Sequence, residues 1–79
     1  MANRRMFSRD VVETDRFLGM PLTAQALYFH LGVRADENGI CANPNGVLRC
    51  IGYNEDDLKI LIQYGFAVPE ENGLIICMD

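Results

Sequence analysis

Three side chains near the end of one predicted helix have the chemistry of a nucleic-acid reader. A glutamine amide such as that of Gln63 can pair with adenine, and a lysine such as Lys59 can meet guanine or phosphate. Tyr64 follows directly and flanks the same face of the helix. Arg49, in the preceding helical segment, can add a phosphate contact or simply be solvated. We therefore consider Arg49, Lys59, Gln63 and Tyr64 as nucleic-acid-binding candidates.

The first residues add a basic arm to these candidates. Arg4 and Arg5 are adjacent, and further arginines follow within the first 16 residues. An arm of this kind can track a phosphate backbone or enter a minor groove. The alternative is plain charge balance, because Asp10, Glu13 and Asp15 lie in the same stretch. We retain Arg4 and Arg5 as further nucleic-acid-binding candidates.

The charge balance of the chain opposes strong DNA binding. The net charge is −4, and residues 53–79 carry one lysine against six carboxylates. Three of these, Glu55, Asp56 and Asp57, begin the predicted helix, where they suit the helix dipole. Glu70 and Glu71 occupy the predicted tip of a hairpin. Because nucleic-acid affinity depends on cations placed against phosphates, we expect any DNA contact from this domain to be weak.

An apolar residue stands on the polar face of the same helix. At 100° per residue, Ile60 lies near the centre of the face opposite Leu58, with Tyr64 one turn further on. Aromatic and apolar centres are typical of protein interfaces, although single exposed apolar residues are also normal. We predict a protein interface that includes Ile60 and Tyr64, and we add Phe7 from the N-terminal segment.

The sequence offers no catalytic or metal-binding pattern. His30 is the single histidine, and no nucleophile or carboxylate recurs beside it as acid–base catalysis would require. Cys41, Cys50 and His30 lack the short spacings of a structural zinc site. We predict no enzymatic activity, no metal and no cofactor. Three cysteines without a close pair indicate a reducing compartment. No apolar run is long enough to cross a bilayer, so we expect a cytoplasmic protein with no membrane partner.

Capping residues and turn signals divide the chain into short elements. Ser8 and Thr14 can each cap a short helical turn, and Gly65 ends the last helix. The pattern predicts helices over residues 24–35 (capped by Thr23), 44–51 (capped by Asn43) and 55–64 (capped by Asn54), and strands over residues 40–42, 66–68 and 74–78. A loop over residues 69–73 joins the last two strands. The first of these helices is apolar on two sides, which predicts a central position in the domain.

This order of elements predicts the fold class. Two capped helices separated by a tight turn have helix-turn-helix spacing, and a hairpin follows them. We predict one domain over residues 1–79, mostly α with a small β-hairpin (α+β), arranged as a winged helix-turn-helix. Such a domain acts by contacting other macromolecules.

Four stretches of the sequence resemble a known family. They are residues 1–8 (MANRRMFS), 15–31 (DRFLGMPLTAQALYFHL), 34–39 (RADENG) and 52–59 (GYNEDDLK). Residues 20–31 are the most specific part. Together they resemble the start of replisome organiser proteins of phages and prophages from low-GC Gram-positive bacteria, a family related to the primosomal DnaD proteins.

The resemblance implies a function as well as a fold. It implies a winged-helix N-terminal module, a fragment of a longer replication protein in the cytoplasm of a bacterial host. Proteins of this family help to load the replicative helicase at an origin, and in DnaD relatives the domain mediates self-association and partner binding. We therefore expect a non-catalytic module of DNA replication initiation, with replication proteins or a second copy as partners. The alternative is a winged-helix transcriptional regulator that reads an operator with Lys59, Gln63 and Tyr64.

Overall fold

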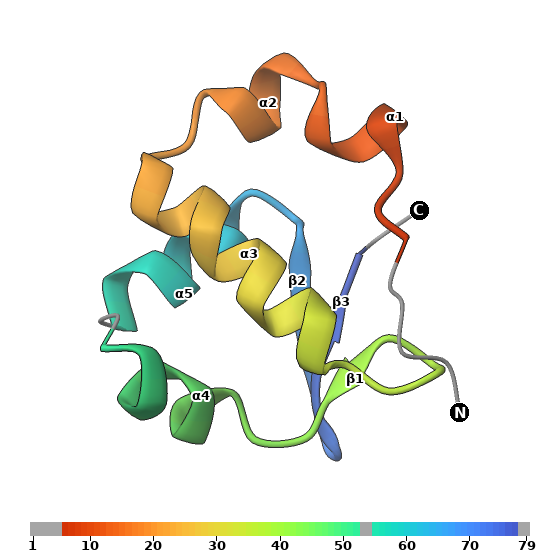
Figure 1. The fold of residues 1–79 in the computed structure, drawn as a ribbon, viewed down its shortest axis with the longest axis vertical. Coiled ribbons are helices and arrows are strands. Elements are labelled where there is room, and N and C mark those ends of the chain that lie inside the picture. Colours follow the sequence, from red (N-terminus) through yellow and green to blue (C-terminus); the bar gives the residue numbers. More distant parts are fainter. Residues whose placement is uncertain (1–5, 53–54, 78–79) are drawn as a thin grey trace.

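The computed structural model describes residues 6–52 and 55–77, which form five helices and a three-stranded antiparallel sheet (Figure 1). The prediction of an α+β domain with a small β component is therefore confirmed. The elements are α1 (Arg9–Val12), α2 (Asp15–Leu18), α3 (Leu22–Arg34), β1 (Ile40–Cys41), α4 (Pro44–Ile51), α5 (Glu55–Gln63), β2 (Ala67–Glu70) and β3 (Gly73–Ile76). None of the helices in these described ranges combines the length and the apolar character needed to cross a bilayer.

Three of the predicted helix caps are confirmed. The side chain of Ser8 accepts a hydrogen bond from the backbone N–H of Asp10 at the start of α1, and Thr14 accepts one from Phe17 at the start of α2. Asn43 accepts one from Gly46 at the start of α4, where Pro44 takes the first helical position. These side chains satisfy backbone donors that have no partner inside a helix. The predicted cap Asn54 lies outside the described residues.

The predicted start of α3 is wrong, because the helix begins before Thr23, the residue predicted to cap it. The helix begins at Leu22 with Pro21 at the N-cap, and no side-chain cap bond forms. Thr23 lies inside the first turn, and its hydroxyl donates to Oδ1 of Asp57 on α5 at 2.9 Å. The helix also ends at Arg34, before the predicted Ala35. The Thr23 hydroxyl, which we predicted to cap α3, therefore forms a hydrogen bond with α5 instead.

The sheet has the order β1–β3–β2. Ile75 of the central strand β3 pairs with Ile40 of β1 on one edge and with Val68 of β2 on the other. The predicted five-residue hairpin loop is wrong, because β2 continues through Pro69 to Glu70 and leaves a two-residue turn at 71–72. Pro69 fits there because β2 is an edge strand, whose outward N–H needs no partner. The predicted strand over 40–42 is shortened to β1, and the strand predicted over 74–78 begins at Gly73 and ends at Ile76.

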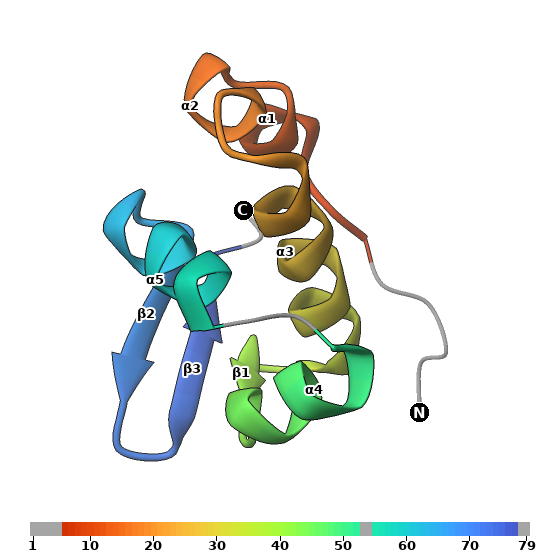
Figure 2. The same cartoon turned by 90° about the vertical axis from the view of Figure 1, so that its left-hand side faces the viewer.

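Helix α3 lies along one side of the sheet and turns its other side away from it (Figure 2). Its inner side buries Ala24, Leu27, Tyr28 and Leu31, and the Tyr28 hydroxyl donates to the backbone carbonyl of Cys77 at 2.7 Å. Figure 2 also shows α1 and α2 at one end of α3, with α4 and the turn of the β2–β3 hairpin toward the other. The buried apolar side chains are Phe17, Met20, Ala24, Leu27, Tyr28, Leu31, Ala35, Cys41, Leu48, Leu61, Phe66, Ala67, Leu74 and Ile76.

Candidate nucleic-acid interface

Two of the predicted DNA-reading residues lie on the exposed face of α5. Lys59 and Gln63 are both exposed and are four residues apart, so their side chains project from the same side of the helix. Glu55 and Asp56 are exposed at the start of the same helix. Tyr64 is half-buried and packs against the core just beyond the last helical residue, so it does not join this face as predicted. The exposed face of α5 therefore combines one cation and one amide with two carboxylates.

The predicted orientation of α5 is partly wrong. Ile60, predicted at the centre of the exposed face, is half-buried and packs against the core. Leu61 is fully buried as expected, while Leu58 is only half-buried. Asp57, one of the three carboxylates predicted to begin this helix, is 8% exposed. The side of α5 that carries Asp57 therefore faces α3, where the Thr23 hydroxyl donates to the Asp57 carboxylate.

Arg49 lies in a hollow between α3 and α4, together with a second arginine. The hollow has a volume of about 530 Å³ and is lined by Arg34, Asn43, Gly46, Val47, Arg49 and Cys50. We call it the α3–α4 hollow. The pairing of Arg34 with Arg49 was missed from the sequence, because they are 15 positions apart on different helices. Two guanidinium groups in one hollow, with no carboxylate among the described residues of its lining, suit an anionic ligand.

A second hollow runs along the outer side of α3. It has a volume of about 490 Å³ and is lined by Ala26, Phe29, His30, Val33 and Arg34. We call it the α3 groove. Phe29 is 37% exposed and Val33 is 59% exposed. The apolar second side of α3 was expected to be covered, but it is covered only in part: the Phe29 ring contacts that of Phe17, whereas Val33 remains exposed.

The predicted interface residue Phe7 packs against α3 within the domain. Its ring centroid lies 5.0 Å from that of Phe29 and 5.8 Å from that of Tyr28. Phe7 is half-buried, so most of its ring already has partners. Arg4 and Arg5, the predicted basic arm, lie outside the described residues.

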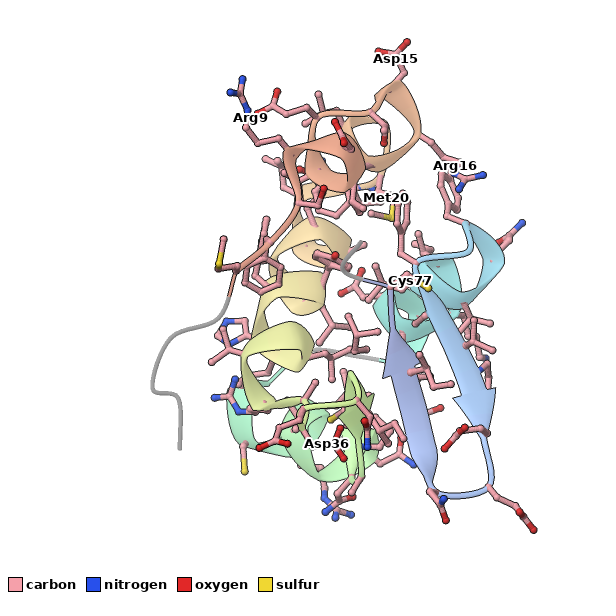
Figure 3. The ribbon with its side chains drawn as sticks, turned by 90° about the vertical axis from the view of Figure 1, so that its right-hand side faces the viewer. Arg9, Asp15, Arg16, Met20, Asp36 and Cys77 are labelled. Carbon is pink, nitrogen blue, oxygen red and sulfur yellow. The ribbon has the colours of Figure 1, made fainter. Side chains whose placement is uncertain are left out.

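The next two arginines along the chain, Arg9 and Arg16, lie on α1 and α2 (Figure 3). Arg9 is exposed on α1. The Arg16 guanidinium carbon lies 5.3 Å from the centroid of the Phe66 ring, a cation–π arrangement. Arg16 also lines a pocket of about 420 Å³ whose wall includes Asp10. A carboxylate in the same pocket makes this site less suited to phosphate than the α3–α4 hollow.

His30 takes part in a local hydrogen-bond arrangement. Nη1 of Arg34 donates to the backbone carbonyl of His30 at 2.9 Å and lies 3.3 Å from its Nδ1. Because arginine can only donate, this contact is a hydrogen bond when Nδ1 carries no proton. In residues 6–52 and 55–77, no three histidine, cysteine or carboxylate side chains gather closely enough to hold a metal ion. All three cysteines are free, and Cys50 is exposed.

Comparison of the chain with models of known protein families, with curated proteins and with solved structures finds no match in any of the three sets. The ligand must therefore be inferred from the chemistry of the surfaces. These are the mixed-charge face of α5, the arginine-lined α3–α4 hollow and the apolar α3 groove.

Proposed function

We propose that this chain is a winged helix-turn-helix domain that works without catalysis, by holding other macromolecules. The supporting observation is the chain order α3, β1, α4, α5, β2, β3 combined with the sheet order β1–β3–β2. In such a domain α4 and α5 are the helix pair, α5 takes the place of the recognition helix, and the β2–β3 hairpin is the wing.

We further propose a role in DNA replication initiation, as a module of a phage-type replisome organiser. The resemblance of residues 20–31 suggests this role. The surface charge favours protein contacts over strong DNA contacts through α5, because Glu55 and Asp56 on α5 and Glu70 and Glu71 on the hairpin are all exposed. These carboxylates repel phosphate at the two places where a winged helix normally meets DNA. Self-association or binding to replication proteins would then dominate.

Sedimentation velocity over a wide concentration range tests this proposal. We expect the sedimentation coefficient to rise with concentration as the chain associates with itself. A mobility assay with unrelated duplexes is expected to show weak, salt-sensitive binding with little sequence preference. A strict monomer at all concentrations would contradict self-association, and tight binding to one duplex alone would contradict the protein-contact role.

One observation favours transcriptional regulation as a second candidate function. Lys59 and Gln63 are exposed one turn apart on α5, the spacing with which a recognition helix addresses neighbouring bases. Selection of duplexes from a random pool tests it. An operator reader would enrich one sequence, and Lys59→Ala with Gln63→Ala would abolish the enrichment. A pool that stays random removes this candidate.

A further inference from the structure

The two hollows beside α3 adjoin each other at Arg34, which lines both of them. On one side of Arg34, the α3–α4 hollow contains Arg49 and Asn43. On the other side, the α3 groove contains Phe29 and Val33. We call the whole the Arg34 surface. It combines an apolar part with a cationic part, and none of the described residues that line either hollow is a carboxylate.

The cationic part is arranged to receive an anion. Nη1 of Arg34 donates to the backbone carbonyl of His30 at 2.9 Å, which orients the guanidinium along α3. A guanidinium has five N–H donors, so most of those of Arg34 remain for a ligand. Arg49 is exposed and forms no hydrogen bond or ion pair with any residue in the described part of the chain. Two guanidinium groups in one hollow can each donate hydrogen bonds to phosphate oxygens.

The carboxylates that follow α3 in the chain, Asp36 and Glu37, lie outside the lining of both hollows. Oδ1 of Asp36 accepts hydrogen bonds from the backbone N–H groups of Asn38 and Ile40, at 2.8 and 3.0 Å. These bonds hold the carboxylate within the α3–β1 turn, where Figure 3 shows it. Glu37 is exposed, and neither residue lines the Arg34 surface.

The apolar part supplies what a flexible polynucleotide needs in addition to cations. Proteins that bind single strands combine a basic groove along the backbone with aromatic side chains against which bases stack. Phe29 offers a partly exposed aromatic ring and Val33 an exposed aliphatic contact beside Arg34. A duplex keeps its base faces stacked inside the helix, so it could use the arginines but not the α3 groove.

We propose that the Arg34 surface binds single-stranded nucleic acid, with phosphates at Arg34 and Arg49 and a base against Phe29 and Val33. Charge complementarity selects this ligand, because two arginines without a carboxylate stand out in a chain of net charge −4. The inference rests on the proposed function in taking nucleic acid as a partner. It uses a surface apart from the exposed face of α5, and it does not require self-association.

Fluorescence anisotropy with a labelled oligothymidylate of about 20 nucleotides tests the phosphate contacts. We expect the strand to bind more tightly than a duplex of the same length. For single strands the slope of log K against log salt is about −0.7 per neutralised phosphate. Arg34→Gln and Arg49→Gln should therefore each make the slope shallower by about 0.7. Arg9→Gln, the same charge change on α1 at the opposite end of α3 (Figure 1), should leave it unchanged.

A second pair of variants tests the base contact. Val33→Glu places a carboxylate in the α3 groove, and we expect it to weaken strand binding about tenfold or more, which is in the range of one lost stacking contact. Leu22→Glu is the control, because Leu22 is 80% exposed on the same helix and lines neither hollow. Both residues are exposed, so both variants should fold, which circular dichroism would show.

Three results would overturn the proposal. The first is no strand binding at low salt, and the second is equal weakening by Val33→Glu and Leu22→Glu. The third is duplex binding as tight as strand binding. If Val33→Glu instead abolished self-association while no strand bound, the surface would belong to a second copy of the chain. In that case the proposed function would survive and this inference would fail.

Discussion

At the scale of single residues, the hydrogen bond between Thr23 and Asp57 ties α3 to α5. The Thr23 hydroxyl donates to Oδ1 of Asp57 at 2.9 Å, and the carboxylate is 8% exposed. Removing a donor to a largely buried carboxylate leaves the acceptor short of a partner. We predict that Thr23→Val lowers the free energy of unfolding by about 1 kcal/mol or more.

Urea unfolding monitored by circular dichroism measures this change. Thr23→Ser is the matched control, since it keeps the hydroxyl and should retain most of the stability. If Thr23→Val proved as stable as Thr23→Ser, the bond would contribute nothing to the packing of α5.

Residue-level roles were predicted well where they depend on near neighbours in the chain. Ser8, Thr14 and Asn43 cap helices because their partners lie two or three residues further on. The burial of Asp57 was not predicted, because Thr23, which donates to it, lies 34 positions away in the chain. The pairing of Arg34 and Arg49 escaped prediction for the same reason, since only the packing of α3 against α4 brings them together.

At the scale of elements, the absence of a side chain at Gly73 allows the end of β1 to approach β3 closely. Its φ is +143°, and a Cβ there would overlap the carbonyl oxygen of Cys41 and lie 2.9 Å from Cα of Ala42. These atoms are backbone, so they cannot move aside without separating β1 from β3. We predict that Gly73→Ala costs about 3 kcal/mol or more, in the range of severe overpacking.

Gly52 provides the control for Gly73→Ala. It ends α4 with φ +76°, and a Cβ there would meet nothing within 4 Å. Gly52→Ala should therefore cost only the backbone strain, about 1 kcal/mol. Thermal unfolding of both variants measures the difference. Equal losses would mean that strain alone, and not the contact with β1, accounts for the effect.

Element boundaries were predictable where a proline or glycine marks the end of a helix and no contact made elsewhere in the fold changes it. Gly52 and Pro44 set the ends of α4 as expected. The hairpin turn was misplaced because Pro69 was taken as a turn residue, whereas the edge position of β2 allows a proline within the strand. Edge and centre are properties of the assembled sheet, so the sequence alone could not distinguish them.

At the scale of the whole molecule, the charge of the surface could be predicted from the sequence, but the exposure of its apolar part could not. The acidic residues of α5 and the hairpin produced a correct expectation that these surfaces carry exposed carboxylates. The exposed apolar side of α3 did not follow from the pattern, because an apolar stripe looks the same whether it is covered or not. Phe29 and Val33 are outward residues only because the sheet and α5 occupy the other side of α3.

The domain is held together by a ring cluster that joins its distant parts. Phe17 of α2 is 1% exposed, and its ring centroid lies 5.0 Å from Tyr28 on α3 and 5.3 Å from Phe66 before β2. A domain of this length is stabilised by about 4–12 kcal/mol in total. Deleting a buried phenylalanine ring costs about 3–5 kcal/mol. We therefore predict that Phe17→Ala removes a large part of the stability and unfolds helices and sheet together.

Calorimetry and circular dichroism distinguish this outcome from local loosening. Phe7→Ala is the control, because Phe7 is half-buried at the edge of the same cluster and should lower the melting temperature less. A single transition in Phe17→Ala, shifted far below that of Phe7→Ala, is expected if α1 and α2 fold as one unit with α3 and the sheet. Two separate transitions would show instead that α1 and α2 are an appendage, and that Phe17 stabilises only their attachment.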